Sequence, residues 1–242
     1  MKPVAIFQHT EVGAPGSIER ILMRLGIPYE RIAIVHGQAV PLDARHFSGL
    51  VFMGGYMSVH DDLPWIGKEL ALIQQAVALD IPVIGHCLGS QLLAAALGAS
   101  VTKAKQSEIG WNSLQFHDSS AAKDWLGGLA GQEALTFQWH GDTFSIPEGA
   151  DHLASSAFCE NQMFVLNGKH VGIQSHLEMT PGLVQLSVQR NGAQLQRQEE
   201  LGNQACSPFA DVLQQLEART KLMEQTLSTI YARWSQGLVH TD

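Results

Sequence analysis

Residues 81–96 read Ile81-Pro-Val-Ile-Gly-His-Cys-Leu-Gly-Ser-Gln-Leu-Leu-Ala-Ala-Ala96 and carry the strongest structural signal in the chain. A short apolar run ending at Gly85 predicts a buried strand, and the small residues from 91 to 97 predict a helix packed closely on a sheet. Cys87 lies on the turn between them, flanked by Gly85 and Gly89. This is the spacing of the nucleophile elbow G-x-S-x-G, with cysteine in place of serine.

The surrounding sequence alternates apolar runs of strand length with segments of helical period, which is typical of an α/β domain. Strands are predicted at 4–7, 30–35, 49–53 and 82–85, and helices at 17–25 and 64–79. Later strand-like pieces around 101, 111–116, 135–139 and 170–174 suit an antiparallel extension. We therefore expect a three-layer α/β/α sandwich with a flavodoxin-like, mostly parallel sheet and an antiparallel extension.

Beyond Pro181 the composition shifts to Gln, Leu, Glu and Arg with helical periodicity, especially over residues 209–234. We predict two helices packed against the domain, with a partner-binding helix as the alternative. The expected organisation is a catalytic domain over residues 1–182 and a C-terminal helical extension over 183–242.

Composition excludes several function classes. The 242 residues have a formal net charge of -8 and no Lys/Arg cluster, which argues against a nucleic-acid partner. The apolar run near the N-terminus is too short for a signal peptide or a membrane span, so no membrane association is expected. Cys87, Cys159 and Cys206 are odd in number and form no C-x-x-C pair, which argues against disulfides and a thiolate zinc site. We expect a cytoplasmic protein without a metal or organic cofactor.

Cys87 has the surroundings of a reactive thiol. A helix that begins just beyond the sulfur presents its positive dipole end and free N–H groups, which favour the thiolate and can receive an oxyanion. Most free cysteines are structural, but the two flanking glycines and the strand-to-helix turn reverse that expectation here. Cys159 and Cys206 lack this context and are interpreted as structural.

A thiol nucleophile in an amidase needs an imidazole base and a group that orients it. His86 neighbours Cys87 in sequence, but adjacent side chains at a turn diverge, so it is a poor base. Two other candidates end predicted strands and precede a carboxylate by two residues: His140 with Asp142, and His176 with Glu178. In extended chain both members of such a pair face the same way. Spacing alone does not choose between them.

These residues resemble the class I glutamine amidotransferase family. The segment Gly85-His-Cys-Leu-Gly-Ser-Gln91 is similar to its nucleophile motif G-x-C-x-G-x-Q, and Gln174-Ser-His-Leu-Glu178 is similar to its closing motif Q-x-H-P-E. Phe52-Met-Gly-Gly-Tyr-Met-Ser58 is similar to its oxyanion strand G-G-P-x-S. The likeness runs from about residue 45 to 180, and Trp139-His-Gly-Asp142 is closest to the stand-alone, GMP-synthetase-like branch.

The resemblance implies a role for each matching position. The implied groups are a catalytic triad of Cys87, His176 and Glu178, an oxyanion hole from the Gly55 and Leu88 amides, and substrate contacts from Gln91, Gly141 and Asp142. Three positions depart from the family pattern: Leu177 replaces a proline between base and orienter, Tyr56 replaces a proline after the paired glycines, and Ser90 replaces a common histidine. The chemical groups of the triad are retained.

The expected activity is hydrolysis of the glutamine side-chain amide through a cysteine thioester, and the expected partner is a synthetase or other ammonia acceptor. Two alternatives stay open. The chain suits a free-standing γ-glutamyl peptide hydrolase that uses the same triad, or a regulatory module whose site does not turn over.

Overall fold

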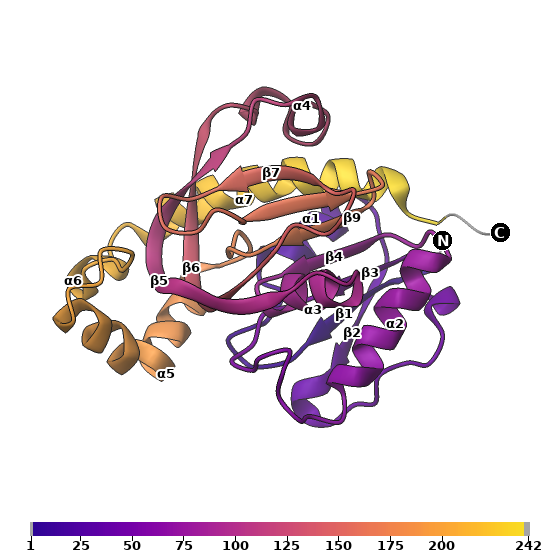
Figure 1. Ribbon diagram of the computed structural model, residues 1–242, viewed down its shortest axis with the longest axis horizontal. Helices are drawn as coiled ribbons and strands as arrows, with labels where there is room; N and C mark the ends of the chain where they lie inside the picture. The colour runs from indigo at the N-terminus through magenta and orange to yellow at the C-terminus, as the bar shows by residue number, and fades with distance from the viewer. Residues whose placement is uncertain (1, 240–242) are drawn as a thin grey trace.

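The computed structural model describes residues 2–239, and within them a nine-stranded mixed sheet lies between two layers of helices (Figure 1). The strand order is β2-β1-β3-β4-β9-β8-β7-β5-β6. The strands are β1 (Val4–Gln8), β2 (Tyr29–Ala33), β3 (Gly49–Phe52), β4 (Val83–His86), β5 (Val101–Phe116), β6 (Glu133–Phe144), β7 (Asp151–Ser155), β8 (Met163–Leu166) and β9 (His170–Ile173). The α-helices are α1 (Ser17–Arg24), α2 (Ile66–Ala78), α3 (Leu88–Ala96), α4 (Ser120–Leu126), α5 (Pro181–Glu200), α6 (Phe209–Val212) and α7 (Leu216–Trp234).

The parallel half of the sheet contains β2, β1, β3, β4 and β9. All residues of β3, β4 and β9 are buried, as expected for strands that are covered by helices on both faces. The predicted flavodoxin-like α/β sandwich is confirmed. In such sheets, functional sites lie beyond the carboxyl ends of the strands, and β4 ends there at His86, directly before Cys87.

The antiparallel half is larger than the sequence pieces indicated. Strands β5 and β6 form a long hairpin with a register shift between Lys103 and Glu108, and β7 and β8 connect this hairpin to β9. The sequence analysis did not predict β7, β8 or α4. These elements have only four to seven residues, which is too short for a clear periodic signal.

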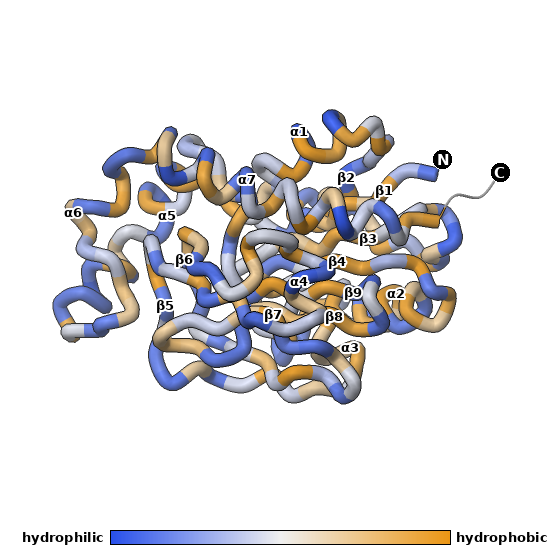
Figure 2. Tube along the Cα trace, turned by 90° about the horizontal axis from the view of Figure 1, so that it is seen from above, coloured by the Kyte–Doolittle hydropathy of each residue, from blue (hydrophilic) through white to orange (hydrophobic). Residues whose placement is uncertain are grey.

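Two apolar cores form, one on each face of the sheet. Along β1, Val4 and Ile6 face one core, whereas Ala5 and Phe7 face the other, because successive strand residues point in opposite directions. Helices α1 and α7 supply the first core, and α2 and α3 supply the second. Figure 2 shows the apolar positions gathered along the central strands and the inner sides of these helices.

The C-terminal segment is helical, as predicted. Thr180 caps α5 by accepting a hydrogen bond from the Leu183 N–H, and Pro181 occupies the first turn. Two helices were predicted beyond Pro181, whereas the structure has three, α5, α6 and α7; the backbone at Gln215, between α6 and α7, turns left-handed with φ 54°. Helix α7 packs on α1, α4 and β6. The division of the chain at residue 182 stays a prediction.

No helix within residues 2–239 has both the length and the apolar character needed to cross a membrane.

Candidate active site

Cys87 lies on a strained turn between β4 and α3. It follows β4 directly and caps α3, with φ 49° and ψ -109°, a conformation that a non-glycine residue adopts only under strain. Its N–H donates to the Ile173 carbonyl over 2.8 Å, and its carbonyl accepts from the Gln91 N–H over 3.1 Å. The helix begins at Leu88 rather than at Gln91 as predicted, so Cys87 directly precedes the first residue of the helix.

The flanking glycines permit this turn by close backbone contact. A Cβ atom on Gly85 would lie 2.2 Å from the Gly89 oxygen, and one on Gly89 would lie 2.0 Å from the Phe52 oxygen. Neither position has room for a side chain.

We expect Gly89→Ala to destabilise the protein by about 1–3 kcal/mol or more, because its methyl group would collide with the backbone of β3. Urea denaturation measures the loss. Gly67→Ala in α2 is the matched control, since nothing lies within 4 Å of the added methyl group there. Equal stability of the two variants would contradict the packing argument.

His176 is held facing Cys87 by backbone pairing and by its neighbour. Its N–H and carbonyl exchange hydrogen bonds with Phe137 of β6 over 2.8 and 3.1 Å, and its Nδ1 lies 2.6 Å from Glu178 Oε1. A Cβ atom on Gly54 would lie 2.9 Å from His176 Cε1 and 3.5 Å from Cys87 Cβ. The ring and the cysteine therefore flank the same glycine, and Leu177 does not prevent Glu178 from reaching the ring.

The electrostatics favour a charged pair. Burial opposes protonation of His176, but the Glu178 carboxylate and the Cys87 sulfur outweigh it and hold the pKa of the ring well above its usual value. Burial also opposes ionisation of Glu178, yet the His176 ring lowers the pKa of this carboxyl below its ordinary value. The site therefore stabilises an imidazolium next to the sulfur.

His86 faces the opposite side of the turn from Cys87 and reaches the second oxygen of Glu178. Its Nδ1 lies 3.7 Å from Glu178 Oε2, and its Nε2 lies 2.9 Å from the Tyr231 hydroxyl of α7. The Tyr231 hydroxyl is the hydrogen-bond partner of Nε2, whereas within residues 2–239 neither His86 Nδ1 nor Glu178 Oε2 has a hydrogen-bond partner. The side chains of His86, Glu178 and Tyr231 are all buried, and α7 covers this side of the site through Tyr231.

Two buried histidines predict acid lability. Burial lowers the pKa of His86 and of His170 to about 4. Each folded-state pKa is below the unfolded value, so the unfolded chain takes up protons first as the pH falls from about 6.5 to 4. The raised pKa of His176 acts in the opposite sense. The stability that it contributes is fully present below about pH 6.5 and is lost as the pH rises through the pKa of the folded state.

We expect the free energy of unfolding to fall between pH 7 and pH 5 by about 1–2 kcal/mol per histidine, measured by urea denaturation. His170→Leu should remove about half of the pH dependence, because it removes one of the two histidines. The substitution breaks no hydrogen bond, since within residues 2–239 neither His170 ring nitrogen has a hydrogen-bond partner. A stability that does not change over this pH range would contradict the assignment.

The rival pair of His140 and Asp142 does not form. His140 Nε2 contacts Glu108 Oε2 at 2.9 Å, and Nδ1 faces the Asp142 backbone oxygen at 2.9 Å. The Asp142 carboxylate instead pairs with Lys103 at 2.6 Å and accepts from the Ser58 hydroxyl. Of the two candidate histidines, only His176 is paired through its ring with the carboxylate two residues later.

One side-chain group within residues 2–239 has donor atoms spaced for a metal ion: Glu108, His140 and Cys159, with atoms within 4.8 Å of one another. Each already has a protein partner. Glu108 also accepts from the Ser156 hydroxyl over 2.7 Å, and Cys159 Sγ lies 3.2 Å from the Thr143 hydroxyl. The group is a buried polar network that anchors β6 next to Gly141 and Asp142.

The predicted oxyanion residues lie beside Cys87. Leu88 is the first helical residue, so its N–H has no acceptor within α3. A Cβ atom on Gly55 would lie 2.9 Å from Leu88 Cδ2, which shows how closely the two residues approach. Gly55 and Cys87 also line the same cavities, so both predicted oxyanion residues lie next to Cys87.

The predicted substrate residues line a polar cavity of about 390 Å³ that opens at Cys87. Gln91 Nε2 donates to the Asp142 carbonyl over 3.3 Å and to Gln174 Oε1 over 3.2 Å, linking α3 to β6 and to the segment after β9. Gly141 and Asp142 form the wall that faces Gln91. The structure therefore brings Gln91, Gly141 and Asp142 together in one cavity.

Several residues at the site were missed from the sequence. Trp139, Ser187 and Asn191 line a second cavity at Cys87, and Gln194 lines the polar one. Ser187, Asn191 and Gln194 are on α5, in a segment whose sequence contains no chemical motif. No sequence signal identifies them, because they lie at ordinary helical spacing and reach the site only through the packing of α5 on β6.

Comparisons with known proteins identify the family of the chain. The family model described as glutamine amidotransferase class-I matches residues 13–194. A crystal structure of a glutamine amidotransferase from Methylobacillus flagellatus superposes with a TM-score of 0.95 at 38% identity, covering 100% of this chain and 97% of that one.

Two curated relatives cover less of the chain. The glutamine amidotransferase-like protein YfeJ of Salmonella typhimurium is 33% identical over 63% of this chain and 67% of its own length. One subunit of the glutamine-hydrolysing GMP synthase of Sulfolobus acidocaldarius is 31% identical over 67% of this chain and 82% of its own. Together with the family model, these matches place the chain in the class I glutamine amidotransferase family.

Proposed function

We propose that this protein is a glutaminase that hydrolyses the side-chain amide of glutamine to glutamate and ammonia, with Cys87 as nucleophile, His176 as acid and base, and Glu178 as orienter. The observation that carries the proposal is the strained Cys87 at the start of α3, facing a His176 ring that is paired with Glu178 at 2.6 Å. This arrangement has the parts of an activated thiol nucleophile.

The proposed cycle has two steps. The Cys87 thiolate attacks the amide carbon, a C–S bond forms, and the C–N bond breaks as the His176 imidazolium gives its proton to the leaving nitrogen. His176 is then neutral and takes a proton from water, whose oxygen attacks the thioester. The C–S bond breaks, and glutamate and the Cys87 thiolate are regenerated with a protonated His176.

The surrounding groups have matching tasks. The Gly55 and Leu88 amides are positioned to receive the oxyanion that forms in both steps. The polar cavity holds the amino-acid end of glutamine against Gln91, Gly141 and Asp142. The ion pair of Lys103 and Asp142 offers one charge of each sign, which complements the α-carboxylate and α-ammonium groups of a free amino acid.

The ammonia product suggests a partner. One relative of this chain is part of a glutamine-hydrolysing GMP synthase, so we infer that a synthetase or other acceptor protein consumes the ammonia. The thioester cycle requires no metal or organic cofactor. Cys87, Cys159 and Cys206 are all free, which suits a reducing cytoplasmic setting.

The test is covalent trapping. An electrophilic glutamine analogue should add to Cys87, and peptide mass spectrometry should find the adduct there. Cys159 and Cys206 are internal controls, since both are free thiols without a helix N-terminus or a facing imidazole. Labelling of Cys87 supports the glutaminase assignment. An unlabelled Cys87 in folded protein would contradict it and would favour a regulatory module without turnover.

A further inference from the structure

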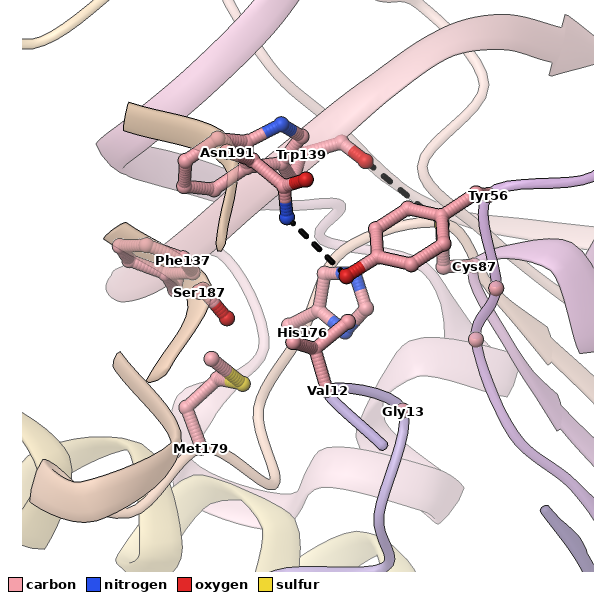
Figure 3. Close-up of a pocket in the computed structure, with 12 residues that line it drawn as sticks. Val12, Gly13, Tyr56, Cys87, Phe137, Trp139, His176, Met179, Ser187 and Asn191 are labelled. Atoms are coloured by element: carbon pink, nitrogen blue, oxygen red, sulfur yellow. Dashed lines mark hydrogen bonds between the residues drawn. The ribbon is translucent and has the colours of Figure 1, made fainter. Parts of the chain in front are cut away.

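Two cavities meet at Cys87, and they differ in size and lining. The polar cavity of about 390 Å³ contains the proposed substrate residues, whereas a second cavity of only about 40 Å³, whose lining Figure 3 shows, also borders Cys87. Cys87, Gly55, Tyr56 and Trp139 line both, but His176 lines only the small one. The rest of the wall of the small cavity includes Phe137, Met179, Ser187 and Asn191.

The proposed mechanism indicates which of the two cavities holds the leaving group. The C–N bond breaks as His176 gives its proton to the nitrogen, so that nitrogen must lie against the His176 ring. The acyl part is too large for the small cavity and occupies the polar one. If the proposed function holds, we infer that the small cavity is the leaving-group subsite and that Tyr56 and Asn191 restrict it to ammonia, so the enzyme selects primary amides over γ-glutamyl secondary amides.

The volume of the small cavity limits which leaving groups it can hold. About 40 Å³ holds roughly two or three water-sized molecules. Ammonia fits together with the water that later attacks the thioester. An amino acid or peptide amine requires more space than this, so we expect the amine of a γ-glutamyl peptide to collide with the Tyr56 ring unless that ring moves.

A single side chain from the loop after β3 closes the outer wall. The Tyr56 hydroxyl accepts a hydrogen bond from Asn191 Nδ2 of α5 over 3.2 Å, and Figure 3 shows the Tyr56 ring lying between this contact and Cys87. Tyr56 is 59% exposed, so this hydrogen bond rather than burial holds the ring in place. Helix α5 is in turn fixed to β6 by the Trp139 Nε1 hydrogen bond to Gln194 Oε1 at 2.8 Å.

The position of Tyr56 in the chain strengthens the inference. It directly follows the proposed oxyanion residue Gly55 and stands where the resembled motif has proline, which could not reach Asn191. Its ring is therefore the part of the wall that can be removed without changing the proposed triad or the oxyanion amides.

The experiment compares two substrates in the full chain. Single-turnover acylation of Cys87 by glutamine and by γ-glutamylethylamide is followed by acid quench and intact-mass analysis. We expect the wild-type protein to react at least about 100-fold faster with glutamine. Tyr56→Ala should reduce that ratio at least about tenfold, mainly by faster reaction with the ethylamide.

Matched variants separate the contributions. Tyr56→Phe and Asn191→Ala each remove the hydrogen bond but keep the ring, and should reduce the ratio less than Tyr56→Ala does. Leu42→Ala, at an exposed position outside both cavities, should leave the ratio unchanged.

The outcomes are distinguishable. Acylation of the wild-type protein by both substrates at similar rates would overturn the subsite while leaving the glutaminase proposal in place. A ratio unaffected by Tyr56→Ala would also overturn the role of Tyr56. Failure of both substrates to acylate Cys87 would overturn the proposed function, and the subsite with it.

Discussion

Replacing Cys87 by alanine is expected to abolish glutamine hydrolysis, with a fall in kcat of at least roughly ten-thousand-fold, as is found when hydrolases lose their nucleophile. The sulfur supplies the bond that holds the acyl intermediate, and no other described thiol faces His176. Glutamate release measured at high enzyme concentration gives the activity. The fold should survive, because the change removes a single atom, whose contacts are with the His176 ring and, at 3.9 Å, with the Trp139 carbonyl.

Cys206→Ala is the matched control for this loss. Cys206 is also a free thiol, but it lies in the segment before α6, where it pairs with Ile109 of β5 and contacts the Ser107 carbonyl. We expect its variant to keep wild-type turnover. Turnover that persists in Cys87→Ala would refute the nucleophile assignment outright.

His176→Ala is expected to slow thioester formation by two to four orders of magnitude, the usual range for loss of a general acid–base. The variant loses the group that protonates the leaving nitrogen and leaves the Glu178 carboxylate without its partner. Rapid-quench measurement of Cys87 acylation isolates this step from hydrolysis of the thioester.

His140→Ala is the matched comparison, because His140 was the other candidate base in the sequence. Its ring pairs with buried Glu108, so its removal should lower stability and loosen β6 at Gly141, raising KM more than it lowers the acylation rate. Equal losses of acylation rate in the two variants would show that the roles of the two histidines had been assigned wrongly.

The sequence predicted the parallel half of the sheet well because its strands are continuous apolar runs between clear helical segments. It predicted the turn at Cys87 for a local reason, the two flanking glycines. It could not choose between His140 and His176, because both end strands and both precede a carboxylate. That choice depends on Phe137, which pairs with the backbone of His176 from a strand almost forty residues away.

The parts of the site that the sequence did not predict come from long-range packing. Asn191 and Ser187 reach the small cavity only because α5 folds back over β6, and Tyr231 reaches His86 across 145 positions of the chain. Helical periodicity shows that such residues face inward, but not what they face. The chemical surroundings of the proposed triad therefore emerged only from the three-dimensional structure.

The packing of α7 against His86, which lies beside Glu178, also affects when activity can arise during synthesis. A nascent chain that has left the ribosome as far as α6 already contains the cysteine, the imidazole and the carboxylate, but it lacks Tyr231, which packs on His86. We expect such a chain to be a poor catalyst until α7 docks, so the enzyme would not release ammonia before its own folding is nearly complete.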